Sequence, residues 1–144
     1  SRGLGDVYKR QEQSFLDLKF TKKKIEINDL LKVQSIKNNI TWLNLADCML
    51  NDNHLSYISN FPNLTRLKIQ KNPLVTNKGI EALQKLEHLT ELNLYGTRVS
   101  NNTLITLGQM KSLKKLFVWN TRITDKGIAD FKALHPDVEV IAGF

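Results

Sequence analysis

The sequence predicts an α/β protein folded as a right-handed solenoid of about five turns, with parallel strands on one face and short α- or 3₁₀-helices on the other. Three observations predict this fold. An apolar ladder recurs at intervals of 24, 25 and 24 residues, polarity alternates within its short strand segments, and apolar residues then follow at every third position. The four copies of the ladder read ITWLNLADCML from Ile40, LTRLKIQKNPL from Leu64, LTELNLYGTRV from Leu89 and LKKLFVWNTRI from Leu113.

Each copy of the ladder contains a segment that predicts a strand. The segments 67–69 and 92–94 alternate with a period of two, which sends the apolar side chains inward and the intervening ones outward. The threefold spacing that follows predicts a short helix, and neighbouring turns must stack because one strand and one helix cannot enclose a core. The apolar helix positions are Leu55, Ile58 and Phe61; Ile80, Leu83 and Leu86; Leu104, Leu107 and Met110; and Ile128, Phe131 and Leu134.

The place where each turn leaves its strand carries a small side chain that can satisfy buried backbone groups. This ninth position is Cys48, Asn72, Thr97 or Thr121, so Cys48 has a structural explanation that we prefer to a catalytic or metal-binding one. The polar linkers that follow predict helix starts capped by Thr76, Ser100 and Thr124, with Asp125 as a further capping residue. We expect Gly79 and Gly127 to serve tight local packing or turn geometry.

Residues 12–39 predict a degenerate first repeat. Shifting the pattern back by 25 residues places Phe15, Leu18 and Phe20 inward on its strand, and Leu30, Val33 and Ile36 on its helix. Its ninth residue is Lys23, so either the backbone departs from the regular turn there or the lysine points outward. No polar cap precedes Phe15, although the end of a solenoid needs one, so we expect the N-terminal end to be truncated.

Residues 40–144 predict regular repeats and a closing strand. In that strand, over residues 136–140, we expect Val138 and Val140 to take the inward positions of Leu116 and Val118. Residues 1–11, SRGLGDVYKRQ, fit no repeat and resemble translated sequencing-adapter sequence, so we interpret them as a non-native or disordered leader; the alternative is a natural linker. Without them the net charge of +7 falls to +5, because they hold three positive charges and one negative charge.

These repeats resemble the leucine-rich repeat family over residues 15–144, and the TDKGI linker at Thr124 resembles those of F-box-associated and bacterial repeats. The segments LNLYGTRVS, LKKLFVWNTRITDKGI and HPDVEVIAGF further resemble the repeat region of bacterial proteins with a planctomycete-type cytochrome c domain. That resemblance implies a membrane-anchored, extracytoplasmic parent whose haem domain precedes the repeats. This chain has no CxxCH motif, so the resemblance carries over a recognition module and no haem chemistry.

The sequence offers no pattern that indicates an enzyme, a metal site or a cofactor site. It contains no glycine-rich phosphate loop, nucleophile elbow or HExxH motif, and its three histidines, His54, His88 and His135, share no ligand spacing with cysteine or carboxylates. No apolar window approaches the ~18 residues of a membrane span. A substrate receptor of the F-box type would need an adaptor segment, and none is visible. We therefore expect no catalytic residues, no metal and no cofactor.

Function is expected on the outward residues of the strands, which form three columns: Asp17, Trp42, Arg66, Glu91 and Lys115; Lys19, Asn44, Lys68, Asn93 and Phe117; and Thr21, Ala46, Gln70, Tyr95 and Trp119. The aromatic members indicate a recognition anchor, a patch covered by a parent domain, or an internal stack. The basic group Arg66, Lys68 and Lys71 indicates either an acidic or phosphate partner or a solvated face, and a nucleic-acid partner is disfavoured because Glu91 and Asp47 interrupt the positive field. The candidate partner-binding residues are Trp42, Arg66, Lys68, Tyr95, Lys115, Phe117 and Trp119.

Two functions follow from this surface. The first is a non-catalytic recognition module that binds a protein, or a glycan, through its strand-lined face. The second is a structural or docking domain of a larger membrane-anchored cytochrome c-like redox protein, for which the resemblance implies an extracytoplasmic location. The residues alone leave the compartment open, and the coding sequence upstream of Gln11 would separate the two functions.

Overall fold

The structure of the chain, a computed structural model, describes residues 6–9, 15–20 and 23–143. These residues form a seven-stranded sheet in the order β1-β2-β3-β4-β5-β6-β7, in which β2 to β7 are parallel and β1 is antiparallel to β2. The strands are β1 Asp6–Lys9, β2 Leu16–Lys19, β3 Ile40–Asn44, β4 Arg66–Lys68, β5 Glu91–Asn93, β6 Lys115–Phe117 and β7 Glu139–Ile141. The α-helices are α1 Ile27–Leu31, α2 Asp52–Ile58, α3 Asn77–Ala82, α4 Asn101–Gly108 and α5 Asp125–Leu134, and the 3₁₀-helices are η1 Gln34–Asn39 and η2 Leu83–Lys85.

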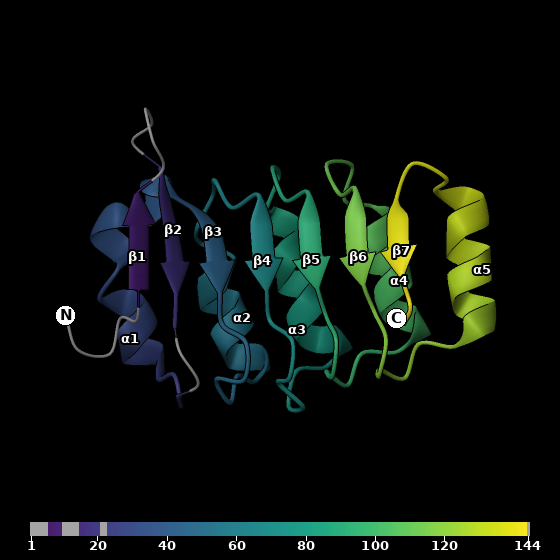
Figure 1. Cartoon of the computed structure of the whole chain (residues 1–144), viewed down its shortest axis with the longest axis horizontal. Helices are drawn as coiled ribbons and strands as arrows, with labels where there is room; N and C mark the ends of the chain where they lie inside the picture. Colours follow the sequence, from purple (N-terminus) through teal and green to yellow (C-terminus); the bar gives the residue numbers. More distant parts are fainter. Residues whose placement is uncertain (1–5, 10–14, 21–22, 144) are drawn as a thin grey trace.

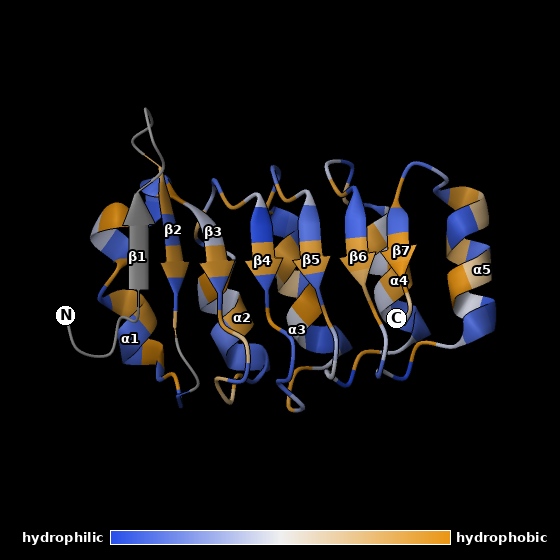
Figure 2. Cartoon of the chain, viewed as in Figure 1, coloured by the Kyte–Doolittle hydropathy of each residue, from blue (hydrophilic) through white to orange (hydrophobic). Residues whose placement is uncertain are grey.

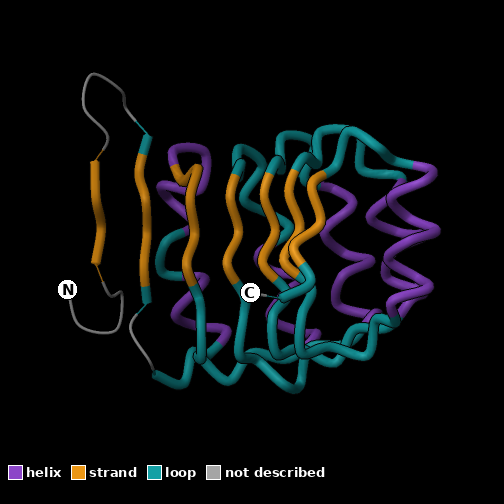
Figure 3. The backbone as a smooth tube through the Cα atoms, turned by 45° about the vertical axis from the view of Figure 1, so that its right-hand side comes forward, coloured by secondary structure: helices purple, strands orange, loops and turns teal. Residues whose placement is uncertain are grey.

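The strands stand side by side in chain order and the helices lie behind them (Figure 1). Turning the molecule shows the strands on one face, the helices on the other and loops joining the two layers (Figure 3). Each strand from β2 to β6 is followed by a helix before the next parallel strand begins, which gives five strand-plus-helix turns and the closing strand β7. The right-handed repeat solenoid that the sequence predicts is therefore confirmed.

The core is a set of rows that run across the turns, one residue from each turn. The central row is Leu43, Leu67, Leu92, Leu116 and Val140, which pair strand to strand. All five are buried. Hydrophobic and hydrophilic residues accordingly share each of these strands (Figure 2). Parallel stacking at this spacing explains why the ladder repeats every 24 or 25 residues: the chain must return to the same place in the next turn.

The helix side of the core also follows the threefold pattern, with one exception. Eleven of the twelve positions named from the sequence are buried, including Leu55, Leu83 and Phe131. The prediction for Leu134 was wrong, because its side chain is 77% exposed. Leu134 is the last residue of α5, and no further turn lies beyond that helix in the described chain.

The first turn follows the prediction except at its start. Leu18 and Phe20 are buried, as are Leu30 and Val33, and Ile36 packs partly against the core. Phe15, expected to point inward, is 38% exposed. A register shift explains the difference. Leu16 pairs with Ile40 but Asp17 pairs with Trp42, so β3 has one residue more than β2 between these two pairs. Ile40 therefore pairs with Leu16 and not with Phe15.

Lys23, in the ninth position of that first turn, has an exposed side chain. The outward orientation offered as one of the two alternatives is therefore the one observed.

The closing strand is real, but its predicted register was wrong by two residues. Val140 pairs with Leu116, and Ile141 pairs with Phe117, so Val138 lies before the strand and packs partly against the core. The 24-residue interval between Leu116 and Val140 equals that between Leu92 and Leu116. The last turn thus keeps the length of the others, and the expected pairing would have required a shorter one.

The turn after each strand satisfies buried backbone groups as predicted, most fully at Asn72. Its Oδ1 accepts hydrogen bonds from the backbone N–H groups of Cys48 and Leu50 at 3.0 and 2.9 Å. Its Nδ2 lies within hydrogen-bonding distance of the carbonyl oxygens of Leu45, Ile69 and Gln70. Thr97 and Thr121 satisfy fewer backbone groups than Asn72, since each hydroxyl donates to one backbone carbonyl.

The residue just before each of these ninth positions has a left-handed backbone. The φ angles are 55° at Asp47, 61° at Lys71, 72° at Gly96 and 55° at Asn120. Glycine, asparagine and aspartate tolerate this conformation best, because larger side chains meet the following carbonyl oxygen. Lysine at position 71 is therefore the member of the row that fits it least.

The helix starts are joined from turn to turn by polar side chains at the first helical residue. Asp52 accepts hydrogen bonds from Thr76, Asn77 accepts from the backbone N–H of Ser100, and Asn101 accepts from that of Thr124. Thr76 and Thr124 also cap their helices as predicted. Ser100 occupies the N-cap position, but its hydroxyl accepts from Asn77 and makes no capping bond, and Asp125 is the first helical residue rather than the cap.

Gly79 leaves the space in which α2 and α3 approach each other. A Cβ built at this position would lie 2.9 Å from Leu55 Cδ1, 3.1 Å from the backbone Cα of Asp52, and closer still to the Asp52 carboxylate. Gly127 is related in the same way to Asn101. The packing role expected for both glycines is confirmed.

Replacing Gly79 with alanine should therefore lower the free energy of unfolding by about 1–3 kcal/mol, as for overpacking elsewhere, although alanine is the better helix former. Chemical denaturation monitored by circular dichroism would measure the change. The matched control is Gly143→Ala, where a Cβ meets no atom within 4 Å. Equal stability of the two variants would show that α2 and α3 are not held this closely.

Strand β1 lies within the segment that we interpreted as a leader. Its four residues, Asp6–Lys9, pair antiparallel with β2, so β1 and not β2 is the first edge strand of the described sheet. An edge strand left unpaired would offer its backbone N–H and C=O groups to other chains. The native origin of residues 1–11 and the boundary at residue 12 remain predictions.

Candidate functional site

The outward residues of the strands form columns in the predicted register. Trp42, Arg66, Glu91 and Lys115 pair in one row, and Asn44, Lys68, Asn93 and Phe117 pair in the next. The third column continues past the strand ends, and its member Thr21 lies outside the described residues. All seven candidate residues therefore lie on the strand face, which we use below as the name of this surface.

At the first column the side chains are paired with one another. The Arg66 guanidinium lies over the Trp42 ring, with 4.1 Å between Cζ and the ring centroid. The Nε of the same guanidinium lies 3.5 Å from Glu91 Oε2. Arg66 therefore already has a carboxylate and an aromatic ring as neighbours, so this column presents a nearly neutral, ordered surface.

The aromatic residues of the C-terminal turns form one group, the aromatic cluster of Tyr95, Phe117 and Trp119. The rings of Tyr95 and Trp119 are stacked, with centroids 4.4 Å apart and an interplanar angle of 27°. Phe117 lies 6.1 Å from Trp119, and Lys115 Nζ lies 5.3 Å from the Phe117 ring. All three aromatic side chains are half-buried, because each ring covers part of the next. The cluster is thus preorganised and still presents apolar surface.

Two adjoining hollows of about 260 and 220 Å³ lie over the last residues of β2, β3 and β4. Lys19 and Asn44 line both hollows, Lys68 lines the larger one and Lys71 lines the smaller one. We call this surface the lysine hollow. In the part of the chain that the structure describes, none of its three lysines forms an ion pair. Sequence reasoning identified Lys68 and Lys71 as basic residues, but not Lys19 as their neighbour.

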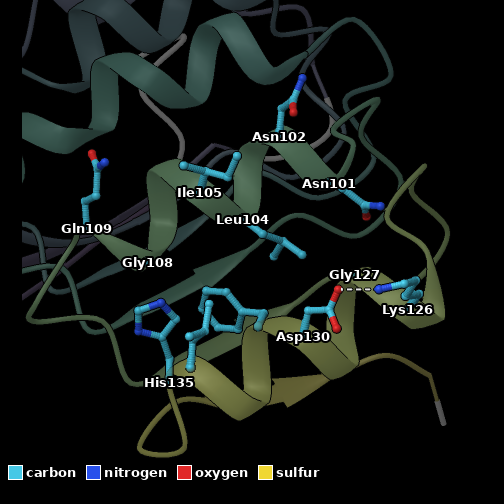
Figure 4. Close-up of a pocket in the computed structure, with 12 residues that line it drawn as sticks. Asn101, Asn102, Leu104, Ile105, Gly108, Gln109, Lys126, Gly127, Asp130 and His135 are labelled. Atoms are coloured by element: carbon cyan, nitrogen blue, oxygen red, sulfur yellow. Dashed lines mark hydrogen bonds and ion pairs between the residues drawn. The ribbon is translucent and has the colours of Figure 1, made fainter.

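A larger groove of about 650 Å³ lies on the opposite, helical face between α4 and α5 (Figure 4). Its exposed apolar residues are Ile105 and Leu134, at 66% and 77%. Figure 4 shows the Lys126–Asp130 ion pair at one end and His135 beside Gly108 at the other. Sequence reasoning missed this groove because the threefold pattern places Leu134 in the core. Leu134 instead lines the groove, together with residues along both helices.

The titratable groups with unusual surroundings have structural roles. Burial raises the pKa of the Cys48 thiol, which keeps it protonated and unreactive at neutral pH. The Asp130 carboxylate accepts a hydrogen bond from Lys126 and raises the pKa of that exposed amine. His54 Nε2 lies 2.6 Å from the carbonyl oxygen of Ile25 and so donates to it, while Nδ1 accepts from the backbone N–H of Asn51. His54 therefore joins two turns.

Two kinds of feature are absent from the described residues. Across 6–9, 15–20 and 23–143 there is no group of three or more histidine, cysteine, aspartate or glutamate side chains suited to a metal ion. Within the same ranges, every helix is too short or too polar to cross a membrane.

No family model matches the sequence. Among solved structures, the chain is similar to a crystal structure of an internalin from Listeria monocytogenes, with 22% sequence identity and a TM-score of 0.63. The match covers 84% of this chain and 32% of that one, so this chain spans less than half of the internalin. At this identity the similarity shows the fold, and the fold is the leucine-rich repeat solenoid.

Proposed function

We propose that this chain is a non-catalytic leucine-rich repeat module that binds a protein partner through the strand face, with the aromatic cluster as the anchor. The observation that carries the proposal is the stacking of Tyr95 on Trp119 at 4.4 Å, with Phe117 against Trp119, on the strand face. A glycan is the second kind of ligand that such rings take.

The physical support is the low cost of ordering these rings. Aromatic side chains combine a large contact area with few rotatable bonds, and such residues dominate the binding energy of protein interfaces. Here the rings already hold one another, so a partner gains apolar contact without immobilising free side chains. The neighbouring Arg66–Glu91 pair provides a polar rim that a partner need not neutralise.

The second candidate function is a docking domain of a larger, membrane-anchored, extracytoplasmic cytochrome c-like redox protein. The observation that favours it is the groove between α4 and α5, where Ile105 and Leu134 expose apolar side chains on the helical face. A neighbouring domain of the parent chain would cover such a groove. The two functions thus use opposite faces of the solenoid, and this makes them separable by mutation.

The test selects binders from a displayed peptide library on the wild-type chain and measures enriched, synthesised peptides against variants by equilibrium titration. The double substitution Tyr95→Ala and Trp119→Ala should weaken binding about thirtyfold, which equals about 2 kcal/mol for a pair of anchor residues. The matched control is Ile105→Ala with Leu134→Ala, on the groove. Circular dichroism would verify that both variants remain folded.

Retained affinity in the aromatic variant together with loss in the groove variant would overturn the strand-face proposal and support the docking domain. Loss in the aromatic variant alone would support recognition through the strand face.

A further inference from the structure

The lysine hollow holds more cationic side chains than carboxylates, together with the side-chain amides of Asn44 and Gln70. Asn44 Oδ1 accepts from the backbone N–H of Ala46 at 3.1 Å, and within the described residues the buried Oε1 of Gln70 has no hydrogen-bond partner. Lys19, Lys68 and Lys71 line the two hollows beside Asn44. With Arg66, the two hollows hold four cations against two carboxylates, those of Asp17 and Asp47. The excess of positive charge is therefore small and local.

Lys71 occupies its place at a conformational cost. Its φ of 61° lies in the left-handed region, where the equivalent residues of the other turns are Asp47, Gly96 and Asn120. Lysine has no short polar side chain to stabilise that conformation, and its Cβ makes it less favourable than glycine. The repeat imposes this conformation, because the backbone N–H of Lys71 donates to the carbonyl of Tyr95 in the next turn, as Asp47 and Gly96 donate at their own places. Lys71 lines the smaller part of the lysine hollow.

We propose that the lysine hollow binds the carboxylates of an acidic segment in the same partner that the aromatic cluster anchors; this inference rests on the proposed function. Lys68 is on β4, and the cluster lies on β5, β6 and the turns that follow them. Adjacent strands are about 4.8 Å apart, so Lys68 and Phe117 are separated by about 10 Å. An extended peptide covers that distance in about three residues. The partner segment therefore carries acidic residues about three to six positions from its apolar anchor.

The charge balance favours a short acidic peptide over a nucleic acid. A nucleic acid presents a phosphate at every nucleotide and requires a continuous positive track. On this face Glu91 follows Arg66 in the first column, and Asp47 lies beside Lys71 in the smaller hollow. The rings of Tyr95 and Trp119 stack on each other, so they are not open to stack separately on bases. The three lysines of the hollow, none of which forms an ion pair in the described residues, suit a short run of carboxylates better than a continuous polyanion.

The experiment uses fluorescently labelled hexaglutamate as the probe and measures its anisotropy with the full chain at low ionic strength. The test variant carries Lys68→Gln and Lys71→Asn. The expected result is a rise in Kd of about tenfold, as for the loss of two partly exposed charge pairs. The single substitution Lys71→Asn should weaken binding while keeping or raising the midpoint of thermal unfolding, because asparagine suits the left-handed corner. Loss of binding in that variant cannot be attributed to unfolding.

The matched control carries Lys85→Gln and Lys111→Gln, two exposed lysines on the helical side with the same total change of charge. It should bind the probe like the wild type. If the control and test variants bound hexaglutamate equally weakly, the loss of affinity would reflect net charge alone, and the proposed site would be wrong. Failure of the wild type to bind hexaglutamate, or tighter binding of an oligouridylate of equal charge, would also overturn it. Peptides that still depend on Tyr95 and Trp119 would then leave the proposed function intact.

Discussion

Replacing Asn72 with alanine should lower the free energy of unfolding by about 3–5 kcal/mol, the largest effect of any polar substitution that we expect. The Asn72 side chain is fully buried and reaches backbone groups of two successive turns. Alanine would leave the N–H groups of Cys48 and Leu50 without their acceptor, in a corner from which water is excluded. Each such group costs about 1–3 kcal/mol when it is buried unpaired.

Thermal and denaturant unfolding of the Asn72→Ala chain would measure this loss. The comparison variant is Thr97→Ala, at the same place in the next turn, where one hydroxyl bond of 2.7 Å to Leu94 is removed. That variant should lose only about 1 kcal/mol. Similar losses in the two variants would show that Asn72 does not connect the turns as described.

Replacing Leu92 with alanine should lower the free energy of unfolding by about 2–5 kcal/mol, as for other buried leucines. Leu92 is completely buried and pairs with Leu67 on one side and Leu116 on the other. Removing its side chain would open a cavity in the middle row of the core. The surrounding strands cannot collapse into that cavity because their spacing is set by backbone hydrogen bonds.

The control for Leu92 is Ile105→Ala, a large-to-small change at a side chain that is 66% exposed. It should alter stability by less than about 0.5 kcal/mol. A negligible loss at Leu92 would mean that the inward and outward residues of β5 are exchanged. The assignment of Glu91 and Asn93 to the strand face would then be wrong as well.

The repeat made most of the fold predictable. A period of 24 or 25 residues places each leucine beside its equivalent in the next turn, so the register from Trp42 to Phe117 followed from the alignment of the copies. The errors lie where a turn lacks a neighbour or departs from the pattern. Phe15 is displaced by an extra residue in β3, and Leu134 lies at the last helix. The error at Val140 is of another kind, because the observed pairing keeps the regular 24-residue interval and the expected one did not.

The site was predictable in position more than in chemistry. Alternation along the strands is sufficient to bring Tyr95, Phe117 and Trp119 onto one face. It does not reveal that Arg66 is already paired with Glu91, because an ion pair depends on rotamers of long side chains. The left-handed backbone at Lys71 could not be predicted either, since the residue type does not determine the φ angle. Because Arg66 is already paired, the lysine hollow is the stronger candidate for an acidic ligand.

The hydrogen bonds between helix starts determine how a local structural change spreads along the solenoid. Asp52 to Thr76, Asn77 to Ser100, and Asn101 to Thr124 each join one turn only to the next. Such a molecule behaves as a one-dimensional lattice, in which a disturbance passes from neighbour to neighbour and weakens with distance. A ligand that spans the face from Lys19 to Trp119 would add a direct link between turns that otherwise never touch. Binding would therefore turn a chain of local couplings into a single cooperative unit.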